Sequence, residues 1–167
     1  IIQHFLALFF PHILAKKFYY ELNNPKIRKI KTTESKIFSK ASEKIRKFNH
    51  LDINTYHWPG EKGKILIIHG WEGRATNFES IIKELVKEKF DVTIFDAPSH
   101  GTSAKSNTTM KDFGEFVQHL LNTTNFDYVI THSFGAVPCS FTLSESHINL
   151  KKIIFIAPPD HFTDWIN

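Results

Sequence analysis

The sequence contains very little sulfur, with one cysteine and one methionine among 167 residues. A single cysteine excludes a disulfide framework within the chain and any zinc site built on cysteines. No metal-ligand spacing and no glycine-rich phosphate loop is present either, so we expect neither a metal nor another cofactor. The scarcity of cysteine fits a reducing compartment, and we expect a cytoplasmic protein.

The chain also lacks an apolar run long enough to span a bilayer. Its most apolar segment, Ile1 to Ala15, is shorter than the ~20 residues required and is interrupted by His4, Pro11 and His12. The segment has neither the charged start nor the small-residue cleavage site of a signal peptide. We therefore expect an amphipathic helix that packs on the protein or lies at a membrane surface.

Positive charge is concentrated at one end of the chain. Residues 1–48 contain eleven Lys/Arg and three Asp/Glu, whereas residues 49–167 contain ten and fourteen. This contrast predicts a basic N-terminal helical arm over residues 1–48 and a core over residues 49–167, although residues 26–48 fit both helix and strand. A basic arm suits an anionic membrane or nucleic acid, while a solvated lysine-rich surface is the commoner case. We expect no nucleic-acid partner and keep peripheral membrane contact of the arm as a hypothesis.

Strand and helix patterns alternate from Ile53 onward. Apolar runs predict strands at residues 53–58 (an edge or second strand), 64–69, 91–96, 126–132 and 151–159. Helices are predicted at residues 77–89, 110–122 and 134–146. This alternation predicts an α/β fold with a three-layer, doubly wound, mostly parallel sheet. Ligands of such sheets gather at the carboxyl ends of the strands.

Three motifs come directly after three of these strands. In "HGWEGR" (residues 69–74), two glycines allow a tight turn whose backbone N–H groups can bind an oxyanion, or a turn without a ligand. In "DAPSHGTS" (residues 96–103), His100 and Ser103 are better explained by local loop structure than by catalysis. In "VITHSFGAVP" (residues 129–138), Ser133 lies at a sharp strand-to-helix turn, either as a nucleophile or as a helix cap. Three motifs on successive strands favour the nucleophile.

With these motifs, residues 53–159 resemble the α/β-hydrolase superfamily. "LIIHGWEGR" is similar to its oxyanion-loop motif, and "FDAPSHGTS" to its D-x-P-G-H-G-x-S segment with Ser99 in place of a glycine. "THSFG" is similar to the nucleophile elbow, with Thr131 in place of the first glycine of G-x-S-x-G.

The resemblance implies roles for individual residues. It makes Ser133 the nucleophile and the backbone N–H groups of Trp71 and Phe134 the oxyanion-hole donors. It makes His69 a structural residue that holds its loop. His132 is not taken as the base, because an elbow points the side chains beside the nucleophile away from it.

The superfamily orders its catalytic residues as serine, acid and histidine along the chain. Only His147 and His161 follow Ser133, and we expect His147 at the opposite edge of the sheet and His161 too soon after the preceding strand. Asp160 is a candidate acid, with a loop cap as the alternative, and Asp164 lies at the same edge. We therefore expect a hydrolase that is incomplete at its C-terminus, with the acid and histidine beyond Asn167.

The function implied is that of a serine hydrolase, carboxylesterase-like, acting on an ester or related acyl bond of a small-molecule substrate. The chain by itself is expected to have weak activity at most. Two alternatives remain open: a non-catalytic binding protein that kept the fold, and an acyltransferase that shares the serine mechanism.

Overall fold

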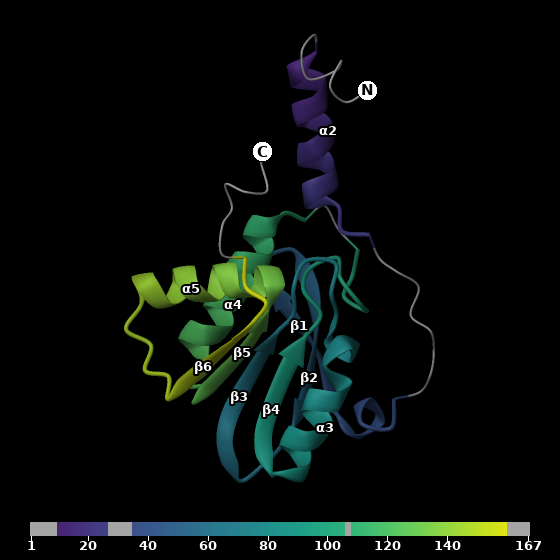
Figure 1. The fold of residues 1–167 in the computed structure, drawn as a ribbon. Helices are drawn as coiled ribbons and strands as arrows, with labels where there is room; N and C mark the ends of the chain where they lie inside the picture. The colour runs from purple at the N-terminus through teal and green to yellow at the C-terminus, as the bar shows by residue number, and fades with distance from the viewer. Residues whose placement is uncertain (1–9, 27–34, 106–107, 160–167) are drawn as a thin grey trace.

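A six-stranded sheet forms the centre of the protein, with its strands in the order β1-β2-β4-β3-β5-β6 (Figure 1). The structure is a computed structural model and describes residues 10–26, 35–105 and 108–159. The strands are β1 (Ser42–Phe48), β2 (Leu51–Trp58), β3 (Lys62–Ile68), β4 (Phe90–Phe95), β5 (Tyr128–His132) and β6 (Lys152–Ile156). The α-helices are α2 (Pro11–Asn23), α3 (Glu79–Lys87), α4 (Met110–Thr123) and α5 (Ala136–Glu145). Short 3-10 helices are η1 (Phe38–Lys40), η2 (Ala75–Phe78) and η3 (Ser133–Gly135).

Four of the strands are parallel. β3 pairs with β4 on one side and with β5 on the other, and β5 pairs with β6. β1 and β2 form a hairpin, and β2 joins the sheet antiparallel to β4. The mostly parallel sheet predicted from the sequence is therefore confirmed. Because β4, β3 and β5 are parallel neighbours, the loops that follow them emerge at the same edge.

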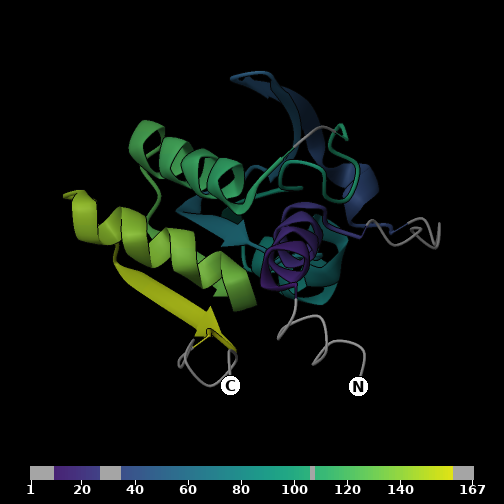
Figure 2. The same cartoon turned by 90° about the horizontal axis from the view of Figure 1, so that it is seen from above.

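Helices cover both faces of the sheet and give three layers (Figure 2). Side chains of β3 alternate between the two resulting cores: Ile65 and Ile67 pack in the cluster with α3, and Leu66 and Ile68 in the cluster with α4 and α5. Burial on both faces explains why this strand is a continuous apolar run in the sequence.

Helix α4 illustrates how the local sequence defines an element. It buries one face, made of Phe113, Phe116, Val117, Leu120 and Leu121. It begins at Met110 because Thr109 and Asp112 form a capping box. The Thr109 hydroxyl oxygen accepts the Asp112 N–H at 3.2 Å, and an Asp112 carboxylate oxygen accepts the Thr109 N–H at 2.7 Å. The helix predicted at residues 110–122 is confirmed.

The end of the predicted helical arm differs from the expectation. β1 pairs with β2 along its whole length, and the hairpin turns at Asn49, whose φ is 54°. Phe38 packs edge-on against the rings of Tyr56 at 5.1 Å and Trp58 at 5.2 Å. The sheet thus begins at Ser42, seven residues before the predicted start of the core at residue 49, because pairing with β2 outweighs the weak helical spacing of this segment.

In the described part of the arm, residues 11–23 are helical. α2 starts at Pro11, where a missing N–H is tolerated, and projects away from the carboxyl ends of the strands (Figure 1). The helix predicted within residues 1–15 overlaps α2 at residues 11–15, and α2 continues to Asn23, while residues 1–9 lie outside the described part. Among the described helices, none is both long enough and apolar enough to cross a membrane.

Cys139 is fully buried on the inner side of α5, and burial raises the pKa of its thiol to about 11. We predict that Ellman's reagent does not label this thiol in the native protein and labels one equivalent in urea, because only an exposed thiolate reacts. The control is Ser140→Cys, an exposed position next to it on α5, which should add one rapidly labelled thiol. Rapid labelling of the unchanged native protein would contradict the described packing of α5.

Candidate functional site

The loops after β3, β4 and β5 contact one another at the carboxyl edge of the sheet. Ala97 donates its backbone N–H to Nε2 of His69 at 2.9 Å, and Glu72 donates its N–H to Nε2 of His100 at 3.0 Å. The third loop approaches so closely that a Cβ added to Gly70 would lie 2.9 Å from Cβ of Ser133. The three motifs that follow successive strands in the sequence therefore form one cluster in space.

Ser133 lies at the turn between β5 and α5, in the first position of η3. Its φ is 48°, a left-handed conformation that is strained for a residue with a side chain. Gly135 permits the tight turn, because a Cβ there would lie 2.6 Å from the carbonyl oxygen of His69 and 2.9 Å from that of Ile68. The turn thus presses the start of α5 onto the end of β3 and leaves Ser133 half-buried.

Backbone strain is concentrated at this edge. Within the described residues, six non-glycine residues have a positive φ, and four of them follow parallel strands: Glu72, Ser99, Ser133 and Ala157. Conformations of this kind cost roughly 1–3 kcal/mol each and persist where the surroundings hold them, commonly at functional sites. Their position supports the carboxyl edge as the functional part of the molecule.

Trp71 and Phe134, the predicted oxyanion donors, come from facing loops. Their rings pack edge-on with centroids 5.8 Å apart, and Phe113 of α4 supports the Phe134 ring at 5.6 Å. In the described part of the chain, neither backbone N–H donates to a carbonyl in a turn, loop or cap. The side chains thus hold the β3 loop against the elbow, and the donor role of the two N–H groups stays a prediction.

His69 is a structural residue, as the sequence analysis expects. Its Nε2 accepts the Ala97 N–H, so the proton resides on Nδ1, which donates to the Gly70 carbonyl oxygen at 2.7 Å. Complete burial and the nearby His100 lower the pKa of His69 to about 3. A neutral imidazole with both nitrogens bonded cannot serve as the base for Ser133.

His100 and Ser103 also form loop contacts, as expected. Nδ1 of His100 donates to the Pro98 carbonyl oxygen at 2.8 Å, and burial lowers the pKa of this imidazole. The Ser103 hydroxyl donates to the Asp96 carbonyl oxygen at 2.5 Å and accepts the Asn54 N–H at 2.9 Å. Both side chains therefore stabilise the β4 loop.

Asp96 connects this loop to its neighbours, a role that the sequence analysis missed. One carboxylate oxygen accepts the Ala75 N–H at 2.7 Å, and the other accepts the Thr102 N–H at 2.8 Å and its hydroxyl at 2.9 Å. Tyr56 also donates its hydroxyl to Asp96 at 3.4 Å, and burial raises the pKa of that phenol to about 12. The only sign of this loop-connecting role in the sequence is that Asp96 is an aspartate at the end of an apolar strand.

The other histidines and acids considered from the sequence point away from Ser133, lie at the opposite edge of the sheet, or lie outside the described residues. The His132 ring turns toward Phe78, with centroids 6.3 Å apart. His147 lies between α5 and β6, beside Phe126 and Asp127 at the amino ends of the strands, as expected. Asp160, His161 and Asp164 lie outside the described residues. Among those that are described, no group of three or more His, Cys, Asp or Glu side chains could hold a metal ion.

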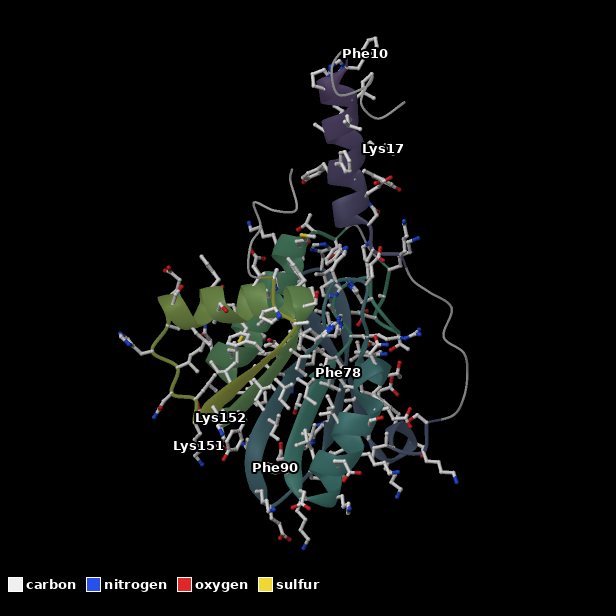
Figure 3. All side chains as sticks on the ribbon, in the orientation of Figure 1. Phe10, Lys17, Phe78, Phe90, Lys151 and Lys152 are labelled. Atoms are coloured by element: carbon white, nitrogen blue, oxygen red, sulfur yellow. The ribbon has the colours of Figure 1, made fainter. Side chains whose placement is uncertain are left out.

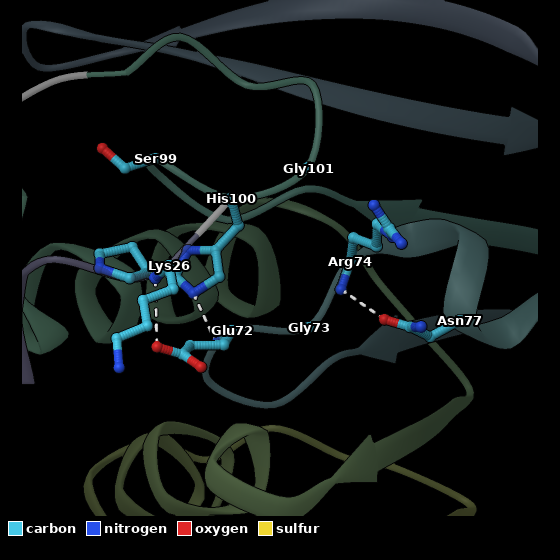
Figure 4. Close-up of a pocket in the computed structure, with 9 residues that line it drawn as sticks. Lys26, Glu72, Gly73, Arg74, Asn77, Ser99, His100 and Gly101 are labelled. Carbon is cyan, nitrogen blue, oxygen red and sulfur yellow. Dashed lines mark hydrogen bonds between the residues drawn. The ribbon is translucent and has the colours of Figure 1, made fainter. Parts of the chain in front are cut away.

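A small polar pocket of about 130 Å³ adjoins the β3 loop (Figure 4). Its walls come from three segments: the end of the arm at Pro25 and Lys26, the β3 loop and η2 at residues 72–74 and 77, and the β4 loop at residues 99–101. Lys26 donates its backbone N–H to the Glu72 carboxylate at 3.1 Å, and Arg74 donates its N–H to Asn77 at 2.9 Å. The arm therefore contacts the loop that carries Trp71, which no local sequence pattern indicates.

Thr131 replaces the first glycine of the elbow motif, and the effect of its hydroxyl on the free energy of unfolding can be measured. The side chain is fully buried, and its hydroxyl has no hydrogen-bond partner in the described structure. We predict that Thr131→Val raises the free energy of unfolding by about 1 kcal/mol in urea titrations, because a buried unpaired hydroxyl is removed. Thr55→Val is the matched control: its hydroxyl donates to the Lys44 carbonyl oxygen at 2.9 Å, and its loss should destabilise the fold. Destabilisation by Thr131→Val as well would contradict the unpaired hydroxyl.

The low pKa of His69 predicts acid sensitivity of the fold. Between the ordinary value of 6.5 and about 3, the unfolded chain binds a proton on this imidazole that the folded chain excludes. The stability that neutral His69 contributes is present above pH 6.5 and falls as the pH drops, by about 1.4 kcal/mol per pH unit. Urea titrations at a series of pH values should show this slope, which His100 increases, and His69→Gln should make it shallower. An unchanged slope in His69→Gln would contradict the assignment.

Comparisons with known proteins agree with this architecture. Among solved structures, a thioesterase domain from the curacin biosynthetic pathway is similar at 18% identity and TM-score 0.65, covering 75% of this chain and 50% of that one. A carboxylesterase structure from Nitrososphaera gargenis matches at 21% identity and TM-score 0.61, covering 74% and 48%. An epoxide hydrolase from Vigna radiata matches at 13% identity and TM-score 0.64, covering 74% and 42%. The chain spans about half the length of these structures, and identities this low establish the fold alone.

No curated protein matches the sequence. A family model described as the alpha/beta hydrolase fold matches residues 63–167, which include all three loops of the carboxyl edge. Its match covers more than half of the chain and agrees with the strand order and the strained elbow. The chain therefore belongs to the alpha/beta hydrolase fold family.

Proposed function

We propose that the protein is a serine hydrolase that cleaves an ester or related acyl bond, with Ser133 as the nucleophile. The observation that carries this proposal is the left-handed φ of 48° at Ser133, on a strand-to-helix turn pressed against Gly70. Such a turn presents the side-chain oxygen at the start of a helix, where the backbone dipoles favour a developing anion. A serine that only capped the helix would not require this strained conformation.

In the proposed reaction, the backbone N–H groups of Trp71 and Phe134 stabilise the charge that develops when the acyl carbon is attacked. Oγ of Ser133 attacks the carbonyl carbon, its proton passes to a general base, and the carbonyl oxygen becomes an oxyanion. The N–H groups of Trp71 and Phe134 would donate to this oxyanion. Collapse of the intermediate expels the alcohol, which takes the proton from the base and leaves an acyl-serine. Water then repeats the sequence and releases the acid.

The general base is assigned to a histidine outside the described residues. His69 and His100 have both ring nitrogens in loop contacts, and His147 lies at the amino edge of the sheet. A serine hydroxyl without a base is a weak nucleophile, so the residues described account for acyl binding and attack but not for fast turnover.

An apolar groove supports an acyl substrate with a hydrocarbon part. The groove has a volume of about 360 Å³, lies between α4 and α5, and begins at Phe134, the residue after Ser133. Gly114, Val137, Pro138 and Phe141 contribute to its walls. The names of the similar structures, which include a thioesterase and carboxylesterases, fit the same class of reaction.

Acylation by p-nitrophenyl butyrate tests the nucleophile directly. We expect mass spectrometry to locate one butyryl group on the peptide that contains Ser133, and p-nitrophenol release to fall at least ~10-fold in Ser133→Ala. Measuring the acyl adduct as well as release keeps the test informative when turnover is slow.

The control variant is Ser140→Ala, which removes an exposed hydroxyl from the same helix and should leave both readings unchanged. Equal release by the protein and Ser133→Ala, with butyryl groups only on lysines, would overturn the proposal and favour a non-catalytic binding protein.

A further inference from the structure

Helix α2 exposes large apolar side chains that a water-facing helix normally lacks. Ile13 is 48% exposed, Phe18 is 49% exposed and Tyr20 is 66% exposed, and Phe10, just before the helix, is 42% exposed. Figure 3 shows Phe10 and Lys17 on this helix far from the sheet. Exposed aromatic groups gathered on one element mark an interaction surface.

The charge around α2 indicates the kind of surface that it fits. Helix α2 has Lys16 and Lys17 exposed beside a single acid, Glu21, and Lys26 follows three residues after its end. Aromatic side chains interleaved with lysines suit the interface of an anionic bilayer, where rings enter the headgroup region and ammonium groups meet lipid phosphates. With 13 residues, α2 is shorter than the ~20 needed to span a bilayer, so it would enter the interface without crossing the membrane.

α2 is also connected to the candidate functional site. It ends at Asn23, and Lys26, three residues later, donates its backbone N–H to the Glu72 carboxylate at 3.1 Å. Glu72 is the neighbour of Trp71, the predicted oxyanion donor, and donates its own N–H to His100. Figures 1 and 2 both place α2 over the carboxyl ends of the strands. The C-terminal end of α2 is therefore next to the β3 loop, and the carboxyl edge of the sheet faces the side to which α2 projects.

We propose that α2 docks the protein on an anionic lipid bilayer through Ile13, Phe18, Tyr20, Lys16 and Lys17, with the carboxyl edge of the sheet facing the membrane. A neutral protein partner or a second copy of this chain would use the aromatic side chains but would gain nothing from the excess of positive charge. An anionic bilayer would bind both the exposed aromatic side chains and the lysines of α2.

This docking also narrows the substrate, in a step that rests on the proposed serine hydrolase function. An edge that faces a bilayer is oriented toward amphiphilic esters whose polar part lies at the interface. Their hydrocarbon part would fit the apolar groove that begins at Phe134. The substrate class is therefore an amphiphilic acyl ester in the bilayer.

Vesicle co-sedimentation tests the docking without reference to catalysis. We expect binding to vesicles of phosphatidylcholine and phosphatidylglycerol in equal parts, release by high salt, and at least ~10-fold weaker binding to phosphatidylcholine alone. Lys16→Glu/Lys17→Glu should weaken binding to the mixed vesicles at least ~10-fold, because each lysine loses its attraction to the anionic surface. Phe18→Ser/Tyr20→Ser should weaken binding to the mixed vesicles at low salt and at high salt.

The matched control is Lys83→Glu/Lys87→Glu, which makes the same change in net charge on exposed positions of α3 and should bind as the unchanged protein does. Equal loss in this control would show that only net charge matters and would overturn the role of α2. Self-association that Phe18→Ser/Tyr20→Ser abolishes, without vesicle binding, would assign the surface to a second copy instead.

Membrane docking and the serine hydrolase function can be tested independently of each other. Ser133→Ala should bind vesicles normally, so docking is measured even if Ser133 is not a nucleophile. Mixed vesicles that contain a p-nitrophenyl ester of a long-chain acid should raise p-nitrophenol release over the same ester in detergent, and Lys16→Glu/Lys17→Glu should remove that increase. Release that is equal in vesicles and detergent, with docking intact, would overturn the bilayer as the source of substrate.

Discussion

The close approach of the elbow to the end of β3 is the contact on which the carboxyl edge depends. Gly135 lies against the carbonyl oxygens of Ile68 and His69, and Gly70 lies against Ser133. Side chains at either glycine would push the two loops apart by more than the packing of a protein interior tolerates. Because the contact is made by backbone, it sets the position of Ser133 within a narrow range. The strained φ of Ser133 is held by this packing and by the edge-on contact of Trp71 with Phe134.

Around this contact, three buried polar groups connect the loops. His69 and His100 accept backbone N–H groups from neighbouring loops, and Asp96 binds backbone N–H groups of Ala75 and Thr102. The bonds from Ala97 to His69 and from Ala75 to Asp96 satisfy buried donors, and leaving such a donor without a partner would cost about 1–3 kcal/mol. Burial keeps both imidazoles neutral by lowering the pKa values of His69 and His100. In this protein, therefore, His69 and His100 stabilise loops, and proton transfer is left to a group elsewhere.

The bond from Lys26 to Glu72 joins two parts of the chain that differ in character. On one side lies a helix with exposed aromatic and basic side chains, and on the other lies the loop of the candidate oxyanion hole. This bond therefore connects the arm directly to the loop of the candidate site. The small polar pocket at this junction has walls from both parts, so it exists only while the arm and the loop are in contact (Figure 4).

Local sequence determined much of this protein. Apolar periodicity predicted the parallel strands β3 to β6 and the helices between them, since burial on one or two faces imposes a period on the side chains. The three loop motifs identified the carboxyl edge and Ser133. Local pattern failed where a distant partner decides the outcome: residues 42–48 fit helix and strand alike, and only pairing with β2 made them β1. The roles of Asp96 and Lys26 likewise required the fold, because their partners Ala75 and Glu72 lie 21 and 46 residues away in the chain. Periodicity is a property of neighbouring residues, whereas a hydrogen bond between loops exists only after the chain has brought them together.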